Sequence, residues 1–434
     1  MFAYYLELAL RSLKRNKILT ALMVLAIGLG IGASMTTLTV FKVLSGDPMP
    51  GKSDRLFRVQ LDPQMKEGYH EGDEPQWDMT RFDSEELLRQ HRAVRQALMT
   101  GGGGVIEPQD TALKPFNVGM RYASSEFFPL FEVPFAAGRG WSNTDDDAHA
   151  RVAVISRALN EKLFKDEDAV GRELQVEGHA LRIIGVLDTW SPKPLFYDLN
   201  AGRFDREEDV FIPFSTAVDL KLPRNGNMNC FGRQVVDDPQ ALDVPCAWMQ
   251  YWVELASPGD AADFKAYLDN YSAQQRAAGR FERPPNTRLR NLTEWLDFQH
   301  AVPGDVRLQM WLALGFLLVC LVNTVGLLLA KFLRRSGEVG VRRALGASRS
   351  EIFRQFLIEA AMVGLAGGVL GLLLALLGLW VVRHRPTEYA ALAHLDVAML
   401  LLTFVLALVA SLLAGVLPAW HATKIAPALQ LKSQ

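Results

Sequence analysis

The 434-residue sequence lacks the short motifs that many enzyme classes carry. It has no phosphate-binding loop ending in Gly-Lys-Ser or Gly-Lys-Thr, no HExxH and no Gly-x-Ser-x-Gly, and its eight histidines are scattered. A run of aspartates at 145–147 is more typical of a solvated loop than of a cation site. The sequence therefore predicts no catalytic residues, no metal site, no bound cofactor and no enzymatic activity of its own.

Cysteine is scarce as well, with three residues in the chain. Three is too few for a small disulfide-stapled scaffold. Cys320 falls in an apolar segment, where packing explains it. Cys230 and Cys246 both fall in a long polar region and could pair in an oxidising compartment, although their spacing alone leaves this open.

The chain as a whole has no strong excess of charge of one sign, since its formal net charge is −2. Basic residues instead gather in the segment 331–354, which holds seven of them against two acidic residues. Such a local concentration argues against a nucleic-acid partner. A basic segment beside apolar spans marks the cytoplasmic side of a membrane, where anchoring to anionic lipid is the simplest role for its arginines.

Long apolar runs occur only towards the two ends of the chain. Four of them predict transmembrane helices, over residues 18–44, 308–332, 355–382 and 397–419. The preceding segment, residues 1–17, is amphipathic and basic, which predicts a helix on the cytoplasmic membrane surface. Residues 383–396 form a short outer loop, and the basic tail 420–434 returns inside. Both ends are therefore predicted to be cytoplasmic.

Small residues and one amide predict how the spans pack. Gly28 and Gly32 give the first span a small-residue face, and Gly364 and Gly368 form a small-xxx-small pair in the third span. Asn323 lies within the second span, where an amide is expected to hydrogen-bond another helix rather than a substrate.

The basic segment between the second and third spans has the pattern of two helices. Ser336 can cap the first helix, Glu338 suits its first turn, and Gly346 can end it. Ser348 and Glu351 fit a capping box for a second helix that continues into the third span.

Glu359 stands near the inner end of that third span. We expect it to pair with a loop arginine such as Arg354 or Arg349. A proton relay would need further buried carboxylates within the spans, and the sequence offers none.

Residues 45–307 contain no membrane-length apolar run and predict a large domain outside the membrane. The pattern indicates strands over 55–61, 151–155 and 174–186 and helices over 82–99 and 156–164. The four glycines at 101–104 are expected to break the chain. The predicted fold class is thus an integral membrane α-helical protein with four transmembrane helices and a large α+β extracytoplasmic domain inserted between helices 1 and 2.

The basic segment also carries a resemblance to a known family. GEVGVRRALGAS at 337–348, followed by FLIE at 356–359, closely resembles the FtsX/MacB superfamily of ABC transporter permeases. The resemblance implies a coupling helix that docks on an ABC ATPase. Its contact residues would be Gly337, Glu338, Val339, Gly340, Arg342, Arg343, Leu345 and Gly346.

Two further stretches support this resemblance. Residues 122–187, including SSEFFPLFEVP at 124–134, look like the periplasmic domain of the MacB family, and GVLPAWHATKIAPAL at 415–429 resembles the superfamily's C-terminal tail. The resemblance implies that 45–307 is a periplasmic MacB-like domain with its stalk, that 333–354 is the coupling-helix loop, and that the protein lies in the bacterial inner membrane.

The resemblance implies a permease subunit of a MacB-type transporter that exports a periplasmic substrate such as a drug or peptide by mechanotransmission. About 17 residues precede the first span, so we expect the ATPase, with its ATP and Mg, on a separate chain. The implied partners are two ATPase copies, an identical or related second permease subunit paired through the first and second helices, membrane lipid and a periplasmic adaptor.

Other functions stay open at this point. FtsX-like members transport no solute and instead regulate cell-wall hydrolases, and the LolC/LolE branch releases lipoproteins. A membrane-anchored scaffold without an ATPase partner is a further alternative. The MacB-like outer domain favours export, and a bound wall hydrolase or a bound adaptor would separate regulation from export.

Overall fold

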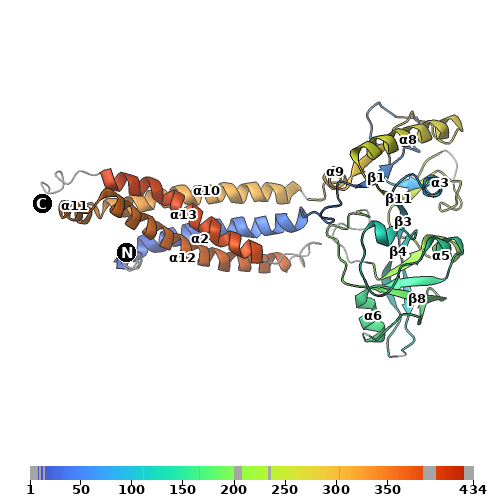
Figure 1. Cartoon of the computed structure of the whole chain (residues 1–434), viewed down its shortest axis with the longest axis horizontal. Helices are drawn as coiled ribbons and strands as arrows, with labels where there is room; N and C mark the ends of the chain where they lie inside the picture. The colour runs from blue at the N-terminus through green and yellow to red at the C-terminus, as the bar shows by residue number, and fades with distance from the viewer. Residues whose placement is uncertain are drawn as a thin grey trace. The chain divides into compact units, whose positions relative to one another are not determined.

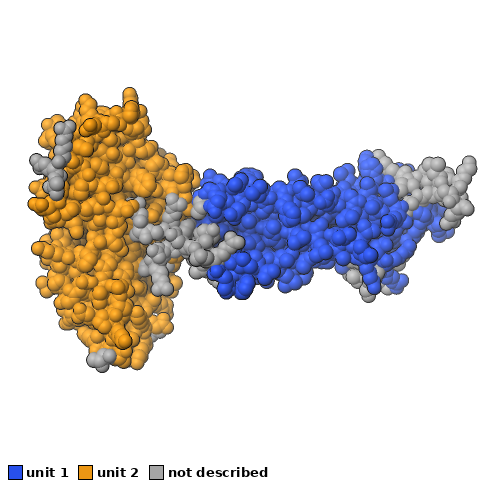
Figure 2. Space-filling view, turned by 180° about the vertical axis from the view of Figure 1, so that it is seen from behind, with its two compact units in different colours: residues 1–45, 302–434 blue, residues 46–301 orange. Residues whose placement is uncertain are grey.

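The structure, a computed structural model, describes residues 8, 11–12, 15–110, 112–165, 167–199, 208–232, 236–302, 304–384 and 397–424. It consists of two compact units, residues 1–45 with 302–434 and residues 46–301, which Figure 2 shows in different colours. The second unit is inserted into the first in sequence. Most of the segment 1–17, most of the outer loop 383–396 and most of the tail 420–434 lie outside the described residues.

Within its described residues, the first unit contains four helices that are long and apolar enough to cross a membrane. They lie side by side in Figure 1 and share one apolar core. Their number and their order around the inserted unit confirm the predicted fold class. α10 and α12 begin before the apolar runs that predicted them, because each helix continues into polar sequence. The four are α2 (Lys17–Leu44), α10 (Gly304–Leu333), α12 (Arg349–Arg383) and α13 (Val397–Lys424).

The predicted small residues lie at helix contacts. A Cβ atom added at Gly28 or Gly32 of α2 would lie 2.8 or 2.7 Å from side-chain atoms of α12. One added at Gly364 or Gly368 of α12 would lie 2.0 or 2.8 Å from side-chain atoms of α13. These glycines therefore let α12 approach α2 on one side and α13 on the other.

The second unit is built on a 12-stranded mixed sheet with the main strand order β12-β1-β11-β3-β4-β9-β6-β8-β5. Strands β4 and β9 are parallel, as are β6 and β8. The strands are β1 (Leu56–Gln60), β2 (Met79–Thr80), β3 (Arg95–Glu107), β4 (Phe116–Ala123), β5 (Phe135–Gly138), β6 (Val152–Ile155), β7 (Glu173–Val176), β8 (His179–Leu187), β9 (Val210–Pro213), β10 (Asn229–Cys230), β11 (Cys246–Glu254) and β12 (Arg288–Asn291).

In the described part of this unit, seven helices pack against the sheet or connect its strands. Several begin at side-chain caps that satisfy their first free N–H groups, as Ser156 does for α6 and Ser257 for α8. The helices are α3 (Arg81–Gln90), α4 (Phe127–Leu130), α5 (Asn143–Asp147), α6 (Arg157–Phe164), α7 (Phe214–Asp219), α8 (Pro258–Ala277) and α9 (Leu292–Phe298).

Alternation along the strands gives the unit two apolar cores, one on each face of the sheet. In β11, Tyr251 and Val253 belong to one core, and Trp252 between them belongs to the other. The first core includes Leu87 of α3 and Phe264 of α8, so these helices cover that face. We call it the α8 face.

The predicted strands 55–61, 151–155 and 174–186 and the predicted helix 156–164 are confirmed. The predicted helix 82–99 is wrong in its second half. Helix α3 ends at Gln90 because His91 takes a left-handed conformation with φ 46°, and strand β3 then starts at Arg95. The glycines at 101–104 do not break the chain but lie within β3.

The aspartates at 145–147 have structural roles. Asp145 forms the capping box of α5 with Ser142, and Asp146 accepts a 2.7 Å hydrogen bond from the backbone N–H of Ser125. Within the described ranges, no group of three or more acidic, histidine or cysteine side chains has the geometry of a metal site.

A cluster of charged side chains is buried on the other face of the sheet. Arg121 of β4 is fully buried and lies 2.8 Å from Asp198, and it also donates two hydrogen bonds to Glu208. The hydroxyl of Tyr197 donates a 2.6 Å hydrogen bond to Glu208, and the Tyr197 ring lies under the Arg121 guanidinium. We call this set the Arg121 cluster.

Candidate coupling site on helix α11

Helix α11 (Ser336–Ala344) lies between the two longest helices, α10 and α12, in the basic segment. Its N-cap residue is Arg335, which makes no side-chain cap hydrogen bond and lies one position before the expected cap at Ser336. Gly346 follows its end with φ 101°, a left-handed conformation that glycine adopts without strain, as predicted. Ser348 and Glu351 form the predicted capping box of α12.

A buried ion-pair cluster lies where α10, α11 and α12 come together. Glu359 of α12 and Lys331 of α10 are both fully buried, and their charged atoms lie 2.6 Å apart. The angle is unfavourable for a hydrogen bond, so this contact is mainly an ion pair. Arg335, the residue before α11, donates a 3.0 Å hydrogen bond to the other Glu359 oxygen. We call Lys331, Arg335 and Glu359 the Glu359 cluster.

The N-terminal segment joins the same cluster through Ser12. Its buried hydroxyl donates a short hydrogen bond to Glu359 and accepts a 2.9 Å hydrogen bond from Arg335. The carboxylate is thus contacted from three parts of the sequence. A carboxylate is costly to bury, and two cations and a hydroxyl donor offset that cost.

The expected partners of Glu359 need correction. Arg354 and Arg349 are both exposed, and Glu359 pairs with Lys331 and Arg335 instead. The reason is the helical period of α12. A residue five positions before Glu359 is rotated by about 140° around the helix, so Arg354 lies on a different face. Sequence spacing favours Arg354 or Arg349, whereas the helix faces favour Lys331 at the end of α10 and Arg335 just before α11.

A second layer of ion pairs extends from the cluster along α11. Arg335 also donates to Glu338 at 3.2 Å, and Glu338 lies 3.0 Å from Arg342 and 3.7 Å from Arg15. Arg342 donates a 3.0 Å hydrogen bond to Gln355 of α12. These contacts fix the first and the last turn of α11 to its neighbours.

Glu338 stays charged in this layer. Burial acts to raise the pKa of Glu338, but the hydrogen bonds and charge of Arg335 outweigh it, with help from the charges of Arg342 and Arg15. The net result is a pKa below the usual value for a glutamate. The carboxylate is therefore ionised at neutral pH and keeps its ion pairs.

The outward side of α11 exposes apolar side chains. Val339 is buried against the bundle, whereas Val341 is 55% exposed and Leu345 is 83% exposed. Arg342 and Arg343 flank them, half-buried. Gly337 has no side chain from elsewhere within 4 Å of where its Cβ would be. An exposed apolar pair with arginines around it is typical of a protein-binding surface.

Asn323 forms no hydrogen bond to another helix among the described residues. It is exposed on α10, and within the described residues its amide makes no hydrogen bond. Its neighbour Thr324 is buried and bonds the Cys320 carbonyl of its own helix at 2.8 Å. The interhelical role expected for Asn323 therefore has no partner within the described bundle.

Sequence analysis missed the cations that hold Glu359. In the sequence, Lys331 and Arg335 appear only as members of a basic segment, and no pattern predicts a role for Ser12. One sequence feature indicates a shared role for them. Lys331 and Arg335 are four residues apart across a helix end, so their side chains can point to the same side of the helix. Which way they face depends on the packing of α10 against α12.

Within the described residues, four helices that could span a membrane, an inserted mixed sheet domain and a short basic helix between two of the spans define an integral membrane protein with a large inserted domain. A family model for the MacB-like periplasmic core domain matches residues 20–271, and a model for the FtsX-like permease C-terminal domain matches residues 310–427. The first match covers more than half of the chain. The chain therefore belongs to the MacB/FtsX family of ABC transporter permeases, as its motifs predicted.

Curated relatives share the family at low identity. A macrolide export ATP-binding/permease protein MacB of Marinobacter nauticus is 24% identical over 99% of this chain and 60% of its own length. A pyoverdine export ATP-binding/permease protein PvdT of Pseudomonas fluorescens is 25% identical over 74% of this chain. This chain covers 46% of that relative. It thus spans only part of both proteins.

Among solved structures, the periplasmic region of MacB from Actinobacillus actinomycetemcomitans aligns with 60% of this chain and 99% of its own, at 11% identity and a TM-score of 0.38.

Proposed function

We propose that this chain is the permease subunit of a MacB-type ABC transporter and that α11 is the docking site of an ABC ATPase. The observation that carries the proposal is the construction of α11. Ion pairs fix the helix on its inner side, and Val341 and Leu345 are exposed on its outer side. A helix that is fixed inside and apolar outside can transmit a movement of its partner instead of absorbing it.

The proposed cycle is mechanical. Two ATPase copies, which bind ATP and Mg, close under α11. The Glu359 cluster passes this movement to α10 and α12. Helix α10 continues in sequence into the extracytoplasmic unit, which would then handle a periplasmic substrate for export. This arrangement requires both chain ends and α11 to lie on the cytoplasmic side.

Asn323 supports a second permease subunit in the assembly. It is exposed on α10 beside Val319 and Val322, which are also exposed. An amide facing lipid hydrocarbon is unfavourable, and a helix from a second subunit would provide it with a hydrogen-bond partner. We therefore place the pairing surface on α10, together with α2, in an identical or related partner. A periplasmic adaptor would complete an export complex.

The first experiment tests docking on α11. The tagged full chain is expressed in its own host and purified in mild detergent, as wild type and as the double variant Val341→Asp, Leu345→Asp. We expect an ABC ATPase to co-purify with the wild type and to be lost from the double variant, because buried carboxylates would oppose docking.

Val94→Asp is the matched control, since Val94 is a 60% exposed valine of the other unit. It should retain the ATPase. If the double variant co-purified with as much ATPase as the wild type does, the proposed docking site would be refuted. A cell-wall hydrolase in the wild-type preparation would replace export with regulation as the function, whereas an adaptor would support export.

A second set of variants tests coupling rather than docking. Replacing Glu338, Arg342 and Arg343 by glutamine removes the second layer of ion pairs while leaving Val341 and Leu345 in place. We expect the ATPase to remain bound and to hydrolyse ATP, while transport is lost. Unchanged transport in this variant would show that these contacts do not carry the movement.

A further inference from the structure

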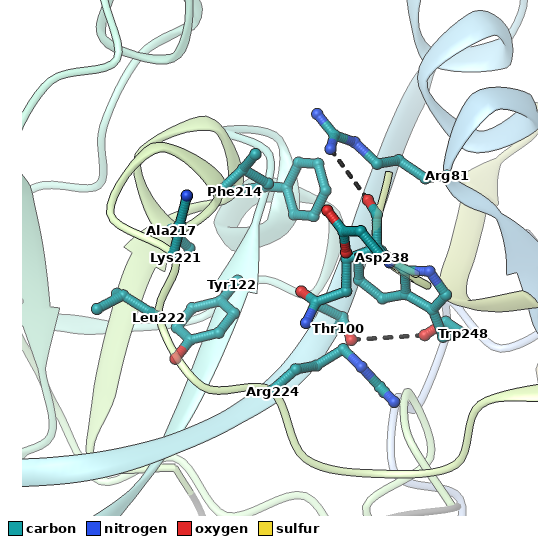
Figure 3. Close-up of a pocket in the computed structure, with 12 residues that line it drawn as sticks. Arg81, Thr100, Tyr122, Phe214, Ala217, Lys221, Leu222, Arg224, Asp238 and Trp248 are labelled. Carbon is teal, nitrogen blue, oxygen red and sulfur yellow. Dashed lines mark hydrogen bonds between the residues drawn. The ribbon is translucent and has the colours of Figure 1, made fainter. Parts of the chain in front are cut away.

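The extracytoplasmic unit contains a cavity of about 440 Å³ that the proposed coupling mechanism does not use. This volume is within the usual range for small-molecule sites. Its lining comes from helix α3, from strands β3, β4 and β11, from helix α7 with the loop after it, and from the segment between β10 and β11. Figure 3 shows these side chains around the cavity, on the α8 face of the sheet.

The floor of the cavity is aromatic. Tyr122 and Trp248 are almost fully buried, and Thr100 between them donates a hydrogen bond to the Trp248 carbonyl. Phe214 of α7 stands with its ring centre 6.2 Å from that of Trp248. The Trp248 indole N–H is buried and has no acceptor among the described residues. Flat apolar groups suit such a floor.

The glycines at 101–104 hold one wall of the cavity in place. The backbone N–H and the side-chain amide of Asn225 bond the carbonyls of Gly101 and Gly102, at 3.1 and 2.9 Å. A Cβ atom at Gly101 would lie 2.2 Å from Asn225 Oδ1, and one at Gly102 would lie 2.2 Å from the Tyr122 ring. The glycine run therefore admits the loop after α7, and it lets the Tyr122 ring lie across β3.

This loop brings positive charge to the cavity. Lys221 is exposed and makes no ion pair within the described part of the chain. Arg224 donates to three backbone carbonyls of its own turn, and no carboxylate of the described residues pairs with it. A third lining cation, Arg81, is paired with Glu85 at 2.6 Å. Asp238 is the one acidic side chain among the described lining residues, so cations outnumber it.

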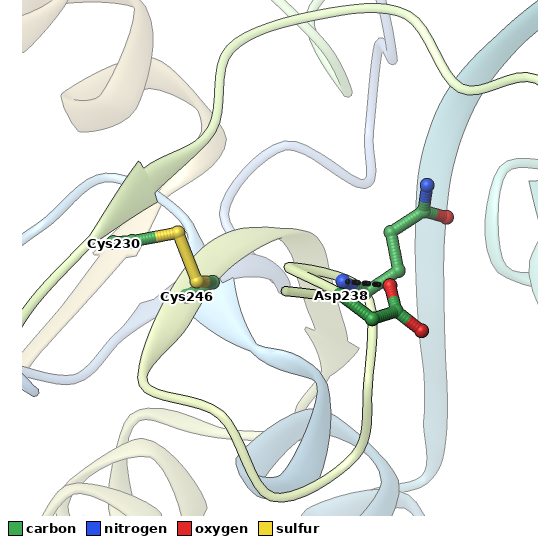
Figure 4. The surroundings of a disulfide bond; sticks show 4 residues. Cys230, Asp238 and Cys246 are labelled. Atoms are coloured by element: carbon green, nitrogen blue, oxygen red, sulfur yellow. Dashed lines mark hydrogen bonds between the residues drawn. A yellow bond between two sulfur atoms is a disulfide. The ribbon is translucent and has the colours of Figure 1, made fainter. Parts of the chain in front are cut away.

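A disulfide-closed segment forms the remaining side. Cys230 and Cys246 are bonded, and they face each other on the antiparallel strands β10 and β11 (Figure 4). Residues 236–245, which we call the lid, lie between them in sequence and include the lining residues Asp238 and Gln240. Arg81 of α3 donates a 3.1 Å hydrogen bond to the Gln240 carbonyl and holds the lid over the cavity.

We propose that this cavity binds a small organic anion with a flat apolar group, and that the Cys230–Cys246 disulfide holds the lid over it. The aromatic floor would take the apolar part of the ligand. Lys221 and Arg224 would take the negative charge. The ligand class follows from an excess of cations beside an apolar floor.

The test is calorimetric titration of the full chain in lipid nanodiscs, without nucleotide or ATPase, so its outcome is independent of the coupling proposal. The probe is 1-naphthalenesulfonate, and the neutral 1-naphthalenesulfonamide of the same shape is its control. We expect the sulfonate to bind and the sulfonamide to bind about tenfold more weakly, because a charge-assisted hydrogen bond is lost.

Two sets of protein variants complete the test. Lys221→Gln with Arg224→Gln should weaken sulfonate binding about tenfold or more. Lys165→Gln should leave it unchanged, and it is a matched control because Lys165 is exposed and has φ 53°, close to the 51° of Lys221. The double variant Cys230→Ser, Cys246→Ser should weaken binding and make it insensitive to a phosphine reductant, whereas the reductant should weaken binding to the wild type.

Three results would overturn the proposal. They are no sulfonate binding to the folded wild type, equal affinity for sulfonate and sulfonamide, or full affinity after loss of both cations. If affinity survives loss of the disulfide, the lid has no role and that part of the proposal fails. The intrinsic fluorescence of Trp248 and its neighbours reports whether each variant is folded.

Discussion

The two units of the molecule each bury a cluster of charged side chains, but the clusters join different kinds of structure. In the extracytoplasmic unit, Arg121 of β4 lies between Asp198 and Glu208, and Glu208 stands just before β9. Strands β4 and β9 are already joined by the hydrogen bonds of a parallel ladder. In the membrane unit, Glu359 joins the ends of helices that share no such ladder. The same chemistry therefore adds rigidity to a sheet in one unit and links separate helices in the other.

The largest effect on stability is expected when the Arg121 cluster is broken. Arg121→Met removes the cation and leaves two buried carboxylates without their partner. We expect the free energy of unfolding of the extracytoplasmic unit to fall by about 3–5 kcal/mol. Thermal unfolding of the purified full chain, followed by tryptophan fluorescence, measures this loss.

Arg157→Met is the control for that substitution. Arg157 also pairs with an aspartate at 2.8 Å, but both partners are about half exposed. An exposed pair contributes about 0–1 kcal/mol, so unfolding should hardly change. If Arg121→Met were as mild as Arg157→Met, the Arg121 cluster would not stabilise the sheet and the comparison between the units would fail.

The two units also differ in how far their structure could be predicted from sequence. Apolar length and basic flanks are enough to place four spans, because a helix that crosses the membrane needs some 20 consecutive, mostly apolar residues. The capping residues Ser348 and Glu351 predict the start of α12, and Gly346 predicts the end of α11. The partners of Glu359 could not be found in this way, since they depend on which helix faces meet.

Sequence patterns were weaker guides in the sheet domain. The segment 82–99 has helix-forming residues throughout, yet a left-handed His91 divides it into a helix and a strand. The glycines at 101–104 look like a break, and only the structure shows Tyr122 and Asn225 using the space above them. The cavity gathers residues from six separate stretches of the described sequence, and no local spacing predicts such a set.

A smaller change in stability and a larger change in function are expected when the Glu359 cluster is altered. Glu359→Gln keeps the shape of the side chain and much of its hydrogen bonding but removes its charge from between Lys331 and Arg335. We expect unfolding free energy to fall by about 2 kcal/mol, in line with the loss of hydrogen bonds to a charged group. Coupling of ATP hydrolysis to transport should fall far more, because the charged contact between Arg335 at the start of α11 and α12 is lost.

Reconstituted vesicles provide the measurement, with ATP hydrolysis and transport determined on the same preparation. Glu351→Gln is the control, since Glu351 is an exposed carboxylate on the same helix that only caps its first turn. It should leave the ratio of transport to hydrolysis unchanged. Equal loss of stability in Glu359→Gln and Arg121→Met, with coupling intact, would mean that both clusters are merely structural.

The smallest effect concerns a carboxylate that is partly buried without a cation. Asp146 of α5 accepts a hydrogen bond from Ser125, and no ion pair to it occurs in the described ranges. Burial raises the pKa of Asp146 to about 6, and the hydrogen bonds from Ser125 only partly oppose that shift. The folded pKa lies above the unfolded value, so between these two values the folded state binds more protons. The contribution to stability is therefore complete below about pH 4 and is lost as pH rises through 6.

The dependence of the free energy of unfolding on pH tests whether a buried carboxylate lowers stability when no cation is paired with it. In the wild type, unfolding free energy should decrease by about 1–2 kcal/mol relative to Asp146→Asn between pH 4 and pH 7, a value reduced for partial exposure. Chemical denaturation of the full chain at several pH values measures it, with the exposed neighbour Asp147→Asn as the control. A parallel dependence in Asp146→Asn and wild type would show that burial without a cation carries no cost here, which would remove the reason for placing two cations around Glu359.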